Sequence, residues 1–395
     1  MSDWHPQQYM SQGKNVGVDQ RILTNAFETA AIIRNINPAL PPIFSLGHLA
    51  FLTGADYNVL RDIASRNNVI PYRIFTIRKK PSPSGELRFR TIAVPRKQLF
   101  AVQQWITQAI LSKLLPHDAS VAFSKGNKLV DAAAPHCNCR WMIKLDVKDF
   151  FESITEISAY RVFRAAGYQP LISFEMARLC TRLKVSDYNP VLRPAPRRQT
   201  KRWQVANYST PSVIQDYKFR RMGHLPQGAP TSPMLANLAV REFDSAIAKL
   251  AAQNGMIYTR YADDMVLSTN DSEFDRARCV SIIGKVYRQM GQFGLTPNLT
   301  KARIASPGSR KVVLGLLVNG AKPALSREFK DRIRQHIYYL TNPDFGPAKH
   351  ATNRGFVSIL GLKHHIQGLL AFANQIDPTF AKTCKDRLAA VDWPF

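Results

Sequence analysis

The sequence predicts an α+β fold whose C-terminal part is wholly helical. Segments that alternate apolar and polar residues, as half-buried strands do, gather in the middle of the chain. Segments with apolar residues at helical spacing separate them, and beyond residue 326 only helical patterns occur. With 395 residues, the chain is long enough for one large domain or two modest ones with a proper core.

The first part of the chain combines helices with one strand pair. Helical spacing of leucines predicts a helix or helix pair over 45–66, and a loosely attached lead-in helix is expected over 20–34. Alternation predicts strands over 72–77 and 87–94, separated by a turn that contains Pro and Gly. A long amphipathic helix over 97–115 follows and ends at a proline.

The middle of the chain supplies the other strands. A half-buried strand is predicted over 142–147, and a helix over 232–250. Two short strands over 256–261 and 265–269 flank a two-Asp turn and indicate a β-hairpin. Between these elements, residues 184–222 are rich in Pro and Arg and are best interpreted as an exposed basic loop or insertion.

The last part of the chain turns from strand to helix. A helix is predicted over 273–292, with a glycine just past its end, and a further strand over 312–318. Two basic helices, over 326–340 and 354–373, complete the expected elements.

The charge of the chain indicates a polyanionic partner. Lys and Arg total 54 against 28 Asp and Glu, which gives a net charge of +26. Each phosphate that a protein neutralises releases a condensed counterion, which makes nucleic acid the first candidate and an anionic membrane surface the alternative. No amphipathic basic helix or lipidation signal supports the membrane, so nucleic acid is favoured. The absence of long apolar runs and of a signal-peptide pattern, with five irregularly spaced cysteines, predicts a reduced cytoplasmic protein without a membrane partner.

Three aspartates form the strongest chemical signal. Asp263 and Asp264 are adjacent in a tight turn, where like charges repel, and Asp146 ends a separate strand. Divalent cations would offset this repulsion, and oxygen ligands suit Mg²⁺ better than zinc. The alternative is a solvated Asp-Asp turn, but apolar strands on both sides favour a buried hairpin. The pattern therefore favours a centre for two Mg²⁺ ions and phosphoryl transfer.

Three segments resemble the palm motifs of reverse transcriptases, in the right order and spacing. They are KLDVKDFFESI (144–154), LPQGAPTSPMLANL (225–238) and TRYADDMVLS (259–268). The second and third most closely resemble the retron enzymes of bacteria, and the likeness extends from about residue 72 to 320.

The resemblance implies a right-hand polymerase with fingers, a ferredoxin-like palm and a helical thumb. Residues 1–44 would be an N-terminal lead-in, 45–320 the fingers and palm, and 321–395 the thumb. Asp146, Asp263 and Asp264 match the metal-binding triad of the family. The main-chain carbonyl of Val147 would be a further metal ligand. Two Mg²⁺ ions are implied, with Mn²⁺ as a possible substitute.

The resemblance also implies a nucleotide-binding set. Phe151 falls where the family places a bulky gate that excludes a 2′-hydroxyl, although a core phenylalanine is the alternative. Gln227 falls where the family contacts the incoming nucleotide. The remaining members would approach the triphosphate from the fingers hairpin and from the segment after the catalytic turn: Lys79, Lys80, Arg90 and Lys301.

The C-terminal helices carry the candidates for nucleic-acid binding. A basic helix face could bind a duplex backbone, as thumb domains do, or be a solvated face, and the net charge favours the first. The residues assigned to this contact are Arg327, Lys330, Arg334 and Lys363.

Two positions depart from the retron pattern. Ala132 stands where these enzymes tend to carry Asn, four residues before His136, and Asn319 stands where Thr is expected. The departures leave open a divergent retron branch or another defence-associated reverse transcriptase. A zinc site at His136, Cys137 and Cys139 is discounted, because no second pair lies at finger spacing.

The function implied by the resemblance is RNA-directed DNA synthesis. In retrons a dedicated non-coding RNA is copied into short single-stranded DNA, primed by a 2′-hydroxyl of that RNA, in an antiphage system with a separate effector protein. The partners implied are this template and primer RNA, its cDNA product, dNTPs and an effector. The alternatives are an intron-like or other defence enzyme with different priming, or a non-catalytic RNA-binding scaffold.

Overall fold

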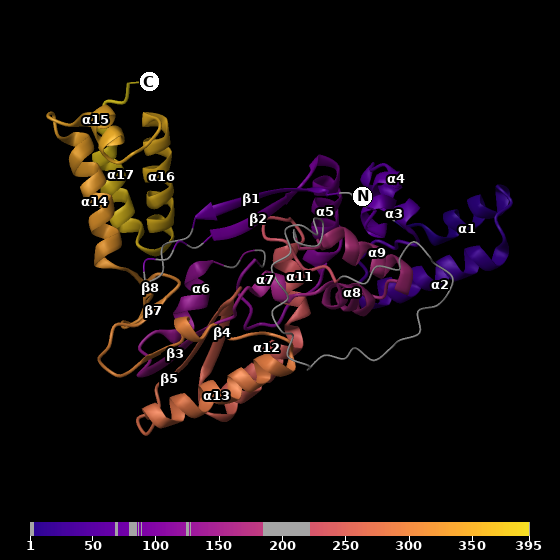
Figure 1. The fold of residues 1–395 in the computed structure, drawn as a ribbon, viewed down its shortest axis with the longest axis horizontal. Helices are drawn as coiled ribbons and strands as arrows, with labels where there is room; N and C mark the ends of the chain where they lie inside the picture. The colour runs from indigo at the N-terminus through magenta and orange to yellow at the C-terminus, as the bar shows by residue number, and fades with distance from the viewer. Residues whose placement is uncertain are drawn as a thin grey trace. The chain divides into compact units, whose positions relative to one another are not determined.

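The computed structural model of the chain describes residues 4–67, 70–78, 85, 87, 89–123, 126, 128–184 and 222–394. The architecture mixes helices and sheets, as predicted (Figure 1). The chain divides into two compact units, each assembled from separate stretches of sequence. The first unit takes residues 1–125, 147–246 and 289–297, and the second takes 126–146, 247–288 and 298–395.

The first unit begins with helices. The expected lead-in is a pair, α1 (Pro6–Asn15) and α2 (Gln20–Ile36). The segment expected as a helix or helix pair is two helices, α3 (Leu46–Thr53) and α4 (Tyr57–Ser65). Gly54 separates them because its φ of 64° closes α3 with a left-handed residue that glycine adopts without strain.

A two-stranded antiparallel sheet follows in the same unit. It pairs β1 (Tyr72–Arg78) with β2 (Phe89–Pro95), as the alternation predicted. Helix α5 (Lys97–Ala109) is shorter than expected, because the chain tightens into a 3₁₀ turn after Ile110.

Further helices complete this unit. Three helices that follow residue 146 were not predicted from the sequence: α7 (Phe150–Ser153), α8 (Glu156–Ala165) and α9 (Pro170–Cys180). The single helix predicted over 232–250 is two helices, α11 (Ser232–Ala239) and α12 (Arg241–Gln253), and Val240 lies between them. The residues of α12 from Ile247 onward are counted with the second unit. Apolar residues continue at helical spacing across Val240, so the sequence pattern could not reveal the break.

The second unit is built on a four-stranded antiparallel sheet. Its order is β4 (Ile257–Tyr261), β5 (Asp264–Thr269), β3 (Trp141–Asp146) and β6 (Arg303–Ala305). The first three strands match the prediction to within a residue or so, whereas the three-residue β6 was missed. Helix α13 (Arg276–Gln292) also matches its prediction closely.

The single strand predicted over 312–318 is wrong. Residues there form two short strands, β7 (Val312–Val313) and β8 (Leu316–Leu317), and β8 also pairs with β9 (Ala324–Leu325). The chain reverses because Leu314 and Gly315 have φ values of 49° and 86°. Positive φ at both central residues is the pattern of a tight hairpin turn whose twist suits its flanking strands.

Four helices end the second unit. They are α14 (Arg327–Thr341), α15 (Gly346–Asn353), α16 (Ile359–Ile376) and α17 (Pro378–Ala389). The helix predicted over 354–373 begins later, because Arg354 ends α15 and the Ser358 side chain accepts a hydrogen bond from the Gly361 amide at the start of α16.

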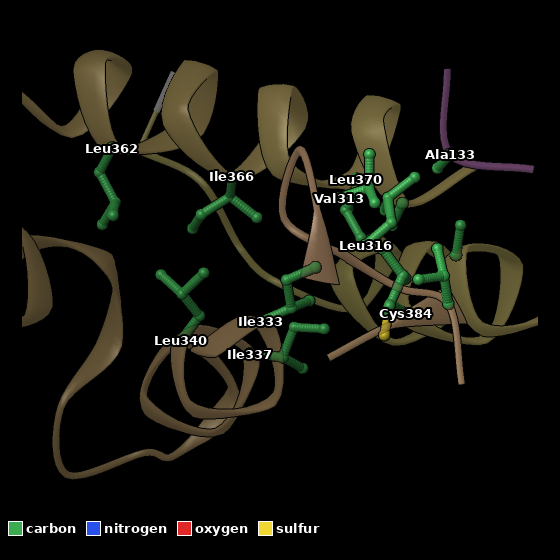
Figure 2. Packing of buried hydrophobic residues seen from close by; sticks show 14 of the residues in the cluster. Ala133, Val313, Leu316, Ile333, Ile337, Leu340, Leu362, Ile366, Leu370 and Cys384 are labelled. Carbon is green, nitrogen blue, oxygen red and sulfur yellow. The ribbon is translucent and has the colours of Figure 1, made fainter. Parts of the chain in front are cut away.

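These helices share one apolar core with part of the sheet region. Figure 2 shows Leu340 of α14 and Ile366 of α16 pointing toward one another, with Ala133 at the margin of the cluster. Ile333, Ile337 and Leu362 are also fully or almost fully buried in it. Burying aliphatic side chains of this size stabilises the packing by about 1.5–3 kcal/mol each.

The basic stretch over 184–222 lies almost entirely outside the described residues, as do Lys79 and Lys80. At its base, Arg182 and His224 form an antiparallel bridge through two main-chain hydrogen bonds of 3.0 and 2.9 Å. Among the helices that the structure describes, none combines the length and apolarity that crossing a membrane requires.

Candidate active site

Asp146 and Asp264 stand side by side in the sheet of the second unit. Asp146 is the last residue of β3, Asp264 is the first of β5, and the two are paired directly in the antiparallel register. Directly opposed side chains in such a pair have Cβ atoms about 4.5–5.5 Å apart. These two aspartates are far apart in the sequence, one at the end of a strand and one beside a turn, but they meet at a single edge of the sheet.

Asp263 belongs to the turn between β4 and β5, together with Ala262. Ala262 has a φ of 54°, an unusual conformation for a residue with a Cβ. Arg260, which is completely buried, donates a hydrogen bond of 2.9 Å from Nη1 to the carbonyl of Ala262. The buried guanidinium thus holds the strained turn that presents both aspartates.

Negative charge is concentrated at this edge of the sheet, in the group of Asp146, Asp263 and Asp264 that we call the aspartate corner. Burial raises the pKa of Asp263, and the charges of Asp146 and Asp264 raise it further. Burial also raises the pKa of Asp264, where Lys144 opposes the shift and Asp146 adds to it. The three carboxylates therefore interact electrostatically, and their negative charge is only partly neutralised by the protein.

Asp146 has two side-chain partners. Lys301 places Nζ 2.5 Å from its Oδ2, and Asn298 donates from Nδ2 to its Oδ1 at 2.8 Å. The Asn298 main-chain N–H also donates to the carbonyl of Asp146 at 2.8 Å. Burial lowers the pKa of Lys301, but the hydrogen bond and charge of Asp146 outweigh it and raise the pKa overall.

Sequence reasoning found Lys301 but missed Asn298. Both lie in the segment around the 3₁₀ turn at Leu299–Lys301, next to the short strand β6. Asn298 fixes the main chain and the carboxylate of Asp146 together, and it is separated from Asp146 by 152 residues. Its position three residues before Lys301, one turn away, was the available signal.

The donors at this corner fit divalent cations. Carboxylate oxygens are the ligands that Mg²⁺ prefers, and a bound cation would favour the ionised forms of Asp263 and Asp264, whose pKa values burial and neighbouring carboxylates raise. Across the described ranges, however, no three His, Cys, Asp or Glu side chains are grouped tightly enough to ligate one ion as they stand. Asp146 is instead paired with Lys301, whose ammonium group occupies one of its two carboxylate oxygens.

His136 contacts both strands of the β4–β5 hairpin through its side chain. Its Nδ1 lies 2.6 Å from the Ser268 hydroxyl and its Nε2 lies 2.8 Å from the Thr259 hydroxyl. These hydroxyls belong to β5 and β4, so the imidazole joins the two strands. Burial lowers the pKa of His136 to about 4, which keeps the ring neutral near pH 7. Both ring nitrogens are occupied by hydroxyls, which leaves neither for a metal or an RNA contact.

Phe151 and the QGAP segment come together within the first unit. Phe151 is half-buried and lines a cavity of about 380 Å³, and Gly228, Ala229 and Pro230 line the same cavity. Its ring also lies 6.4 Å from that of Phe123. The predicted gate therefore borders open space and is not a fully enclosed core residue.

The main chain of Gln227 lies against strand β2, which also carries Arg90. The Ala93 amide donates to the Gln227 carbonyl at 2.7 Å. A Cβ added to Gly228 would lie 3.0 Å from Ile92, so only glycine allows this approach without a shift. Arg90 is exposed and lies two residues from Ile92, which puts it on the same face of β2.

The four basic residues assigned to nucleic-acid binding on the C-terminal helices have intramolecular partners. Lys330 is 2.6 Å from Asp377, and Arg327 and Arg334 both pair with Asp331, at 3.6 and 2.8 Å. Lys363 lies over the Trp393 ring at 5.1 Å. The side chains of Arg327 and Arg334 are nevertheless largely exposed, at 92% and 54%, so a ligand that reached them would compete only with exposed ion pairs.

A family model for reverse transcriptases, described as RNA-dependent DNA polymerases, matches residues 77–340, which is more than half of the chain. The retron Ec86 reverse transcriptase of Escherichia coli is 30% identical over 314 residues, which cover 79% of this chain and 83% of that protein. The chain is a reverse transcriptase of the retron type.

Two further relatives agree with this assignment. The retron Mx65 reverse transcriptase of Myxococcus xanthus is 28% identical over 85% of the chain and 69% of its own length. The retron Ec73 reverse transcriptase of E. coli is 29% identical over 74% of the chain and 80% of its own length. The retron-type reverse transcriptase described here is accordingly an RNA-directed DNA polymerase.

Proposed function

We propose that this reverse transcriptase copies a dedicated non-coding RNA into short single-stranded DNA, with Asp146, Asp263 and Asp264 as its catalytic residues. The observation that carries the proposal is the direct register of Asp146 with Asp264 at the edge of one sheet, beside a turn that holds Asp263. The membership of the family and the partly unneutralised charge of the three carboxylates support it.

The three carboxylates would hold two Mg²⁺ ions, or Mn²⁺ in their place, with the carbonyl of Val147 as a further ligand. Bound ions supply the positive charge that activates an attacking hydroxyl and stabilises the leaving pyrophosphate. Asn298 fixes the Oδ1 side of Asp146, and Lys301 neutralises its Oδ2 side. The Lys301 side chain is half exposed, so its ammonium can leave Asp146 and turn toward a triphosphate.

Residues of the first unit would select and hold the incoming nucleotide. The Phe151 ring would leave no room for a 2′-hydroxyl, which makes DNA the product. Gln227 would contact the nucleotide, and the close approach at Gly228 keeps its main chain against β2. Arg90, with Lys79 and Lys80 outside the described residues, would clamp the triphosphate through positive charge.

In this proposal the chain has the parts of a right-hand polymerase. Residues 1–44 form the lead-in, 45–320 the fingers and a ferredoxin-like palm, and 321–395 the thumb. The four-stranded antiparallel sheet under the aspartates suits a palm, and the four helices from α14 onward suit a thumb. The thumb residues Arg327, Lys330, Arg334 and Lys363 would contact the nucleic-acid backbone.

The finer biology follows the retron relatives. The primer would be a 2′-hydroxyl of the template RNA, and the product a branched RNA–DNA hybrid that acts with a separate effector protein in antiphage defence. Ala132 is completely buried, and the Asn319 side chain accepts from the Lys311 amide and donates to the Ser309 carbonyl. Ala132 is thus part of the buried interior, whereas Asn319 is exposed and its side chain joins two main-chain segments of the same hairpin region.

Primer extension tests the proposal. Purified protein is given a primed RNA template, dNTPs and Mg²⁺, and we expect a product that DNase degrades and that ribonucleotides do not support. Nucleic acid that co-purifies with the protein is sequenced in parallel. One discrete cDNA joined covalently to one RNA supports the retron reaction. Failure to extend any primer contradicts catalysis and favours an RNA-binding scaffold.

A further inference from the structure

A polar cavity lies among the C-terminal helices, within the second unit. Its volume is about 660 Å³, inside the ~300–1,000 Å³ range typical of small-molecule sites. Helix α14 lines one side, and residues between α15 and α16 and on α16 line the other. The lining residues are Glu328, Asp331, Arg332, Gln335, His336, Arg354, Phe356 and His365. None of them belongs to the nucleotide-binding or nucleic-acid-binding sets discussed above.

The cavity has a surplus of positive charge. Its two carboxylates are neutralised from elsewhere, because Glu328 is bound by Arg310 at 2.5 Å and Asp331 by Arg334 at 2.8 Å. Arg354 is positioned by Gln335, whose Oε1 accepts from its Nη2 at 2.5 Å. Arg332 is exposed and forms no hydrogen bond or ion pair with any described residue. Two guanidinium groups thus remain for an anionic ligand, and this group binds phosphate well.

A buried histidine pair contributes one wall. His336 is only 4% exposed, and its Nδ1 lies 2.9 Å from Nε2 of the buried His350. The Nε2 of His336 forms no hydrogen bond within the described part of the chain. Burial, with His350 and the nearby arginines, lowers the pKa of His336 to about 4, so the ring is neutral near pH 7. A neutral imidazole offers one donor or one acceptor, as the edge of a base requires.

Aromatic surface completes the site. Phe356 is half-buried, and its ring lies 5.3 Å from that of His365, which is exposed. Both line the cavity together with the arginines. Flat rings beside guanidinium groups are the combination that binds an unstacked base and its phosphate.

We infer that this cavity binds a single unpaired nucleotide. Arg332 and Arg354 hold its phosphate, Phe356 and His365 contact the face of its base, and His336 offers a hydrogen bond from the wall. The nucleotide is either one residue of an RNA strand or a free mononucleotide, which share this chemistry. The site is distinct from the aspartate corner and needs no polymerisation.

Two binding measurements in EDTA test the inference and distinguish the two sources. In the first, AMP is titrated calorimetrically into the full-length protein after nuclease treatment and high-salt washing. In the second, a short single-stranded RNA carrying 4-thiouridine is photo-crosslinked, and the attached peptides are identified by mass spectrometry. Because neither assay involves DNA synthesis, an inactive polymerase centre would not mimic a negative result.

The variants are Arg332→Ala and the double variant Arg332→Ala/Arg354→Ala. The matched control is Arg387→Ala, which removes the same charge from an exposed position on α17 outside the cavity. We expect Arg332→Ala to weaken AMP binding about tenfold, since one charge-assisted hydrogen bond is lost, and the control to leave it unchanged. Thermal unfolding of each variant verifies that the helices remain folded.

Each outcome decides the inference. AMP binding together with RNA crosslinks at Phe356 or His365, both weakened in Arg332→Ala, supports a nucleotide within an RNA strand. AMP binding without crosslinks there supports a free mononucleotide. Absence of both signals in the wild type overturns the inference. An equal loss in Arg332→Ala and Arg387→Ala also overturns it, because it would indicate general electrostatic attraction alone.

Discussion

The aspartate corner and the C-terminal helices treat charge in opposite ways. At the corner, Asp263 and Asp264 keep raised pKa values because burial and mutual repulsion are only partly offset. On the helices, Lys330 is paired with Asp377 and Arg334 with Asp331. Uncompensated charge is costly to a fold, so its persistence indicates a ligand, whereas paired charge has a structural explanation of its own. Arg332 has no ion-pair partner among the described residues. In this respect it resembles the aspartate corner more than it resembles Lys330 and Arg334 on the same helix.

The largest effect is expected at the corner itself. Asp264→Asn removes one anionic ligand from the proposed ion centre, and several kcal/mol of transition-state stabilisation should be lost with it, so primer extension should fall about a thousandfold. The control is Asp271→Asn, an exposed aspartate of the same unit that pairs with Arg278 at 3.6 Å. If the two variants had comparable activity in single-turnover assays, the unneutralised charge of the aspartate corner would not mark a catalytic site.

The next effect concerns the pH dependence of stability. The pKa of His136 is about 4 in the folded protein and near 6.5 when unfolded, so the unfolded state binds the proton more readily. Stability should therefore fall as pH drops from about 6.5 to 4, by up to ~1.4 kcal/mol per pH unit for this group. His136→Asn should flatten that slope in denaturant unfolding curves, and an unchanged slope would show that His136 does not carry it.

Asn298→Ala should impair catalysis less than loss of an aspartate. Its side chain orients Asp146 without replacing it, and removing such a partner of a metal ligand typically costs about 10–100-fold in metal affinity or activity. A higher Mg²⁺ requirement would mark the loss as one of positioning. Asn254→Ala, which removes a bond to a helix carbonyl in the same unit, is the matched control. A uniform loss at all Mg²⁺ concentrations would argue against positioning.

A smaller effect, of opposite sign, is expected for stability. Since the folded protein raises the pKa of Asp263, its ionised form destabilises the native state at neutral pH. Asp263→Asn should raise the free energy of unfolding measured in EDTA, while lowering activity. A destabilised variant would mean that the turn needs the carboxylate for its structure and that repulsion is not the dominant effect.

The smallest effect is expected on the helices. Asp331→Asn weakens the ion pairs to Arg327 and Arg334, and exposed pairs of this kind contribute only about 0.2–1 kcal/mol. Freed arginines should bind RNA more strongly, with a steeper dependence on salt concentration. RNA affinity measured at several salt concentrations tests this. Unchanged affinity and slope would place both arginines outside the nucleic-acid contact.

Local patterns predicted the strands of the corner well. The apolar residues located β3, β4 and β5 nearly to the residue, although burial in the folded chain does not alternate, since β5 is buried at five consecutive positions. The turn at Leu314–Gly315 was missed because positive φ at a leucine leaves no trace in an apolar pattern. The break at Val240 was missed for a similar reason, since apolar residues continue on both sides.

Long-range partners explain what the sequence could not show of the site. The aspartates were evident from the residues themselves, but the hold of Asn298 on Asp146 depends on a contact across 152 positions. The pairing of Lys330 with Asp377 spans 47 positions, so a basic helix face looked unpartnered in the sequence. Charges near one another along a helix are visible in a sequence, whereas those brought together by packing are not.

Metal binding by the aspartate corner is the most direct test of the proposed two-ion centre. The number and affinity of bound Mn²⁺ ions are measured by electron paramagnetic resonance on the full-length protein with primed RNA template and a non-hydrolysable dNTP analogue. We expect two bound ions in the wild type and loss or strong weakening of both in Asp264→Asn, with Asp271→Asn unchanged. Equal Mn²⁺ binding by the wild type and Asp264→Asn would contradict this expectation.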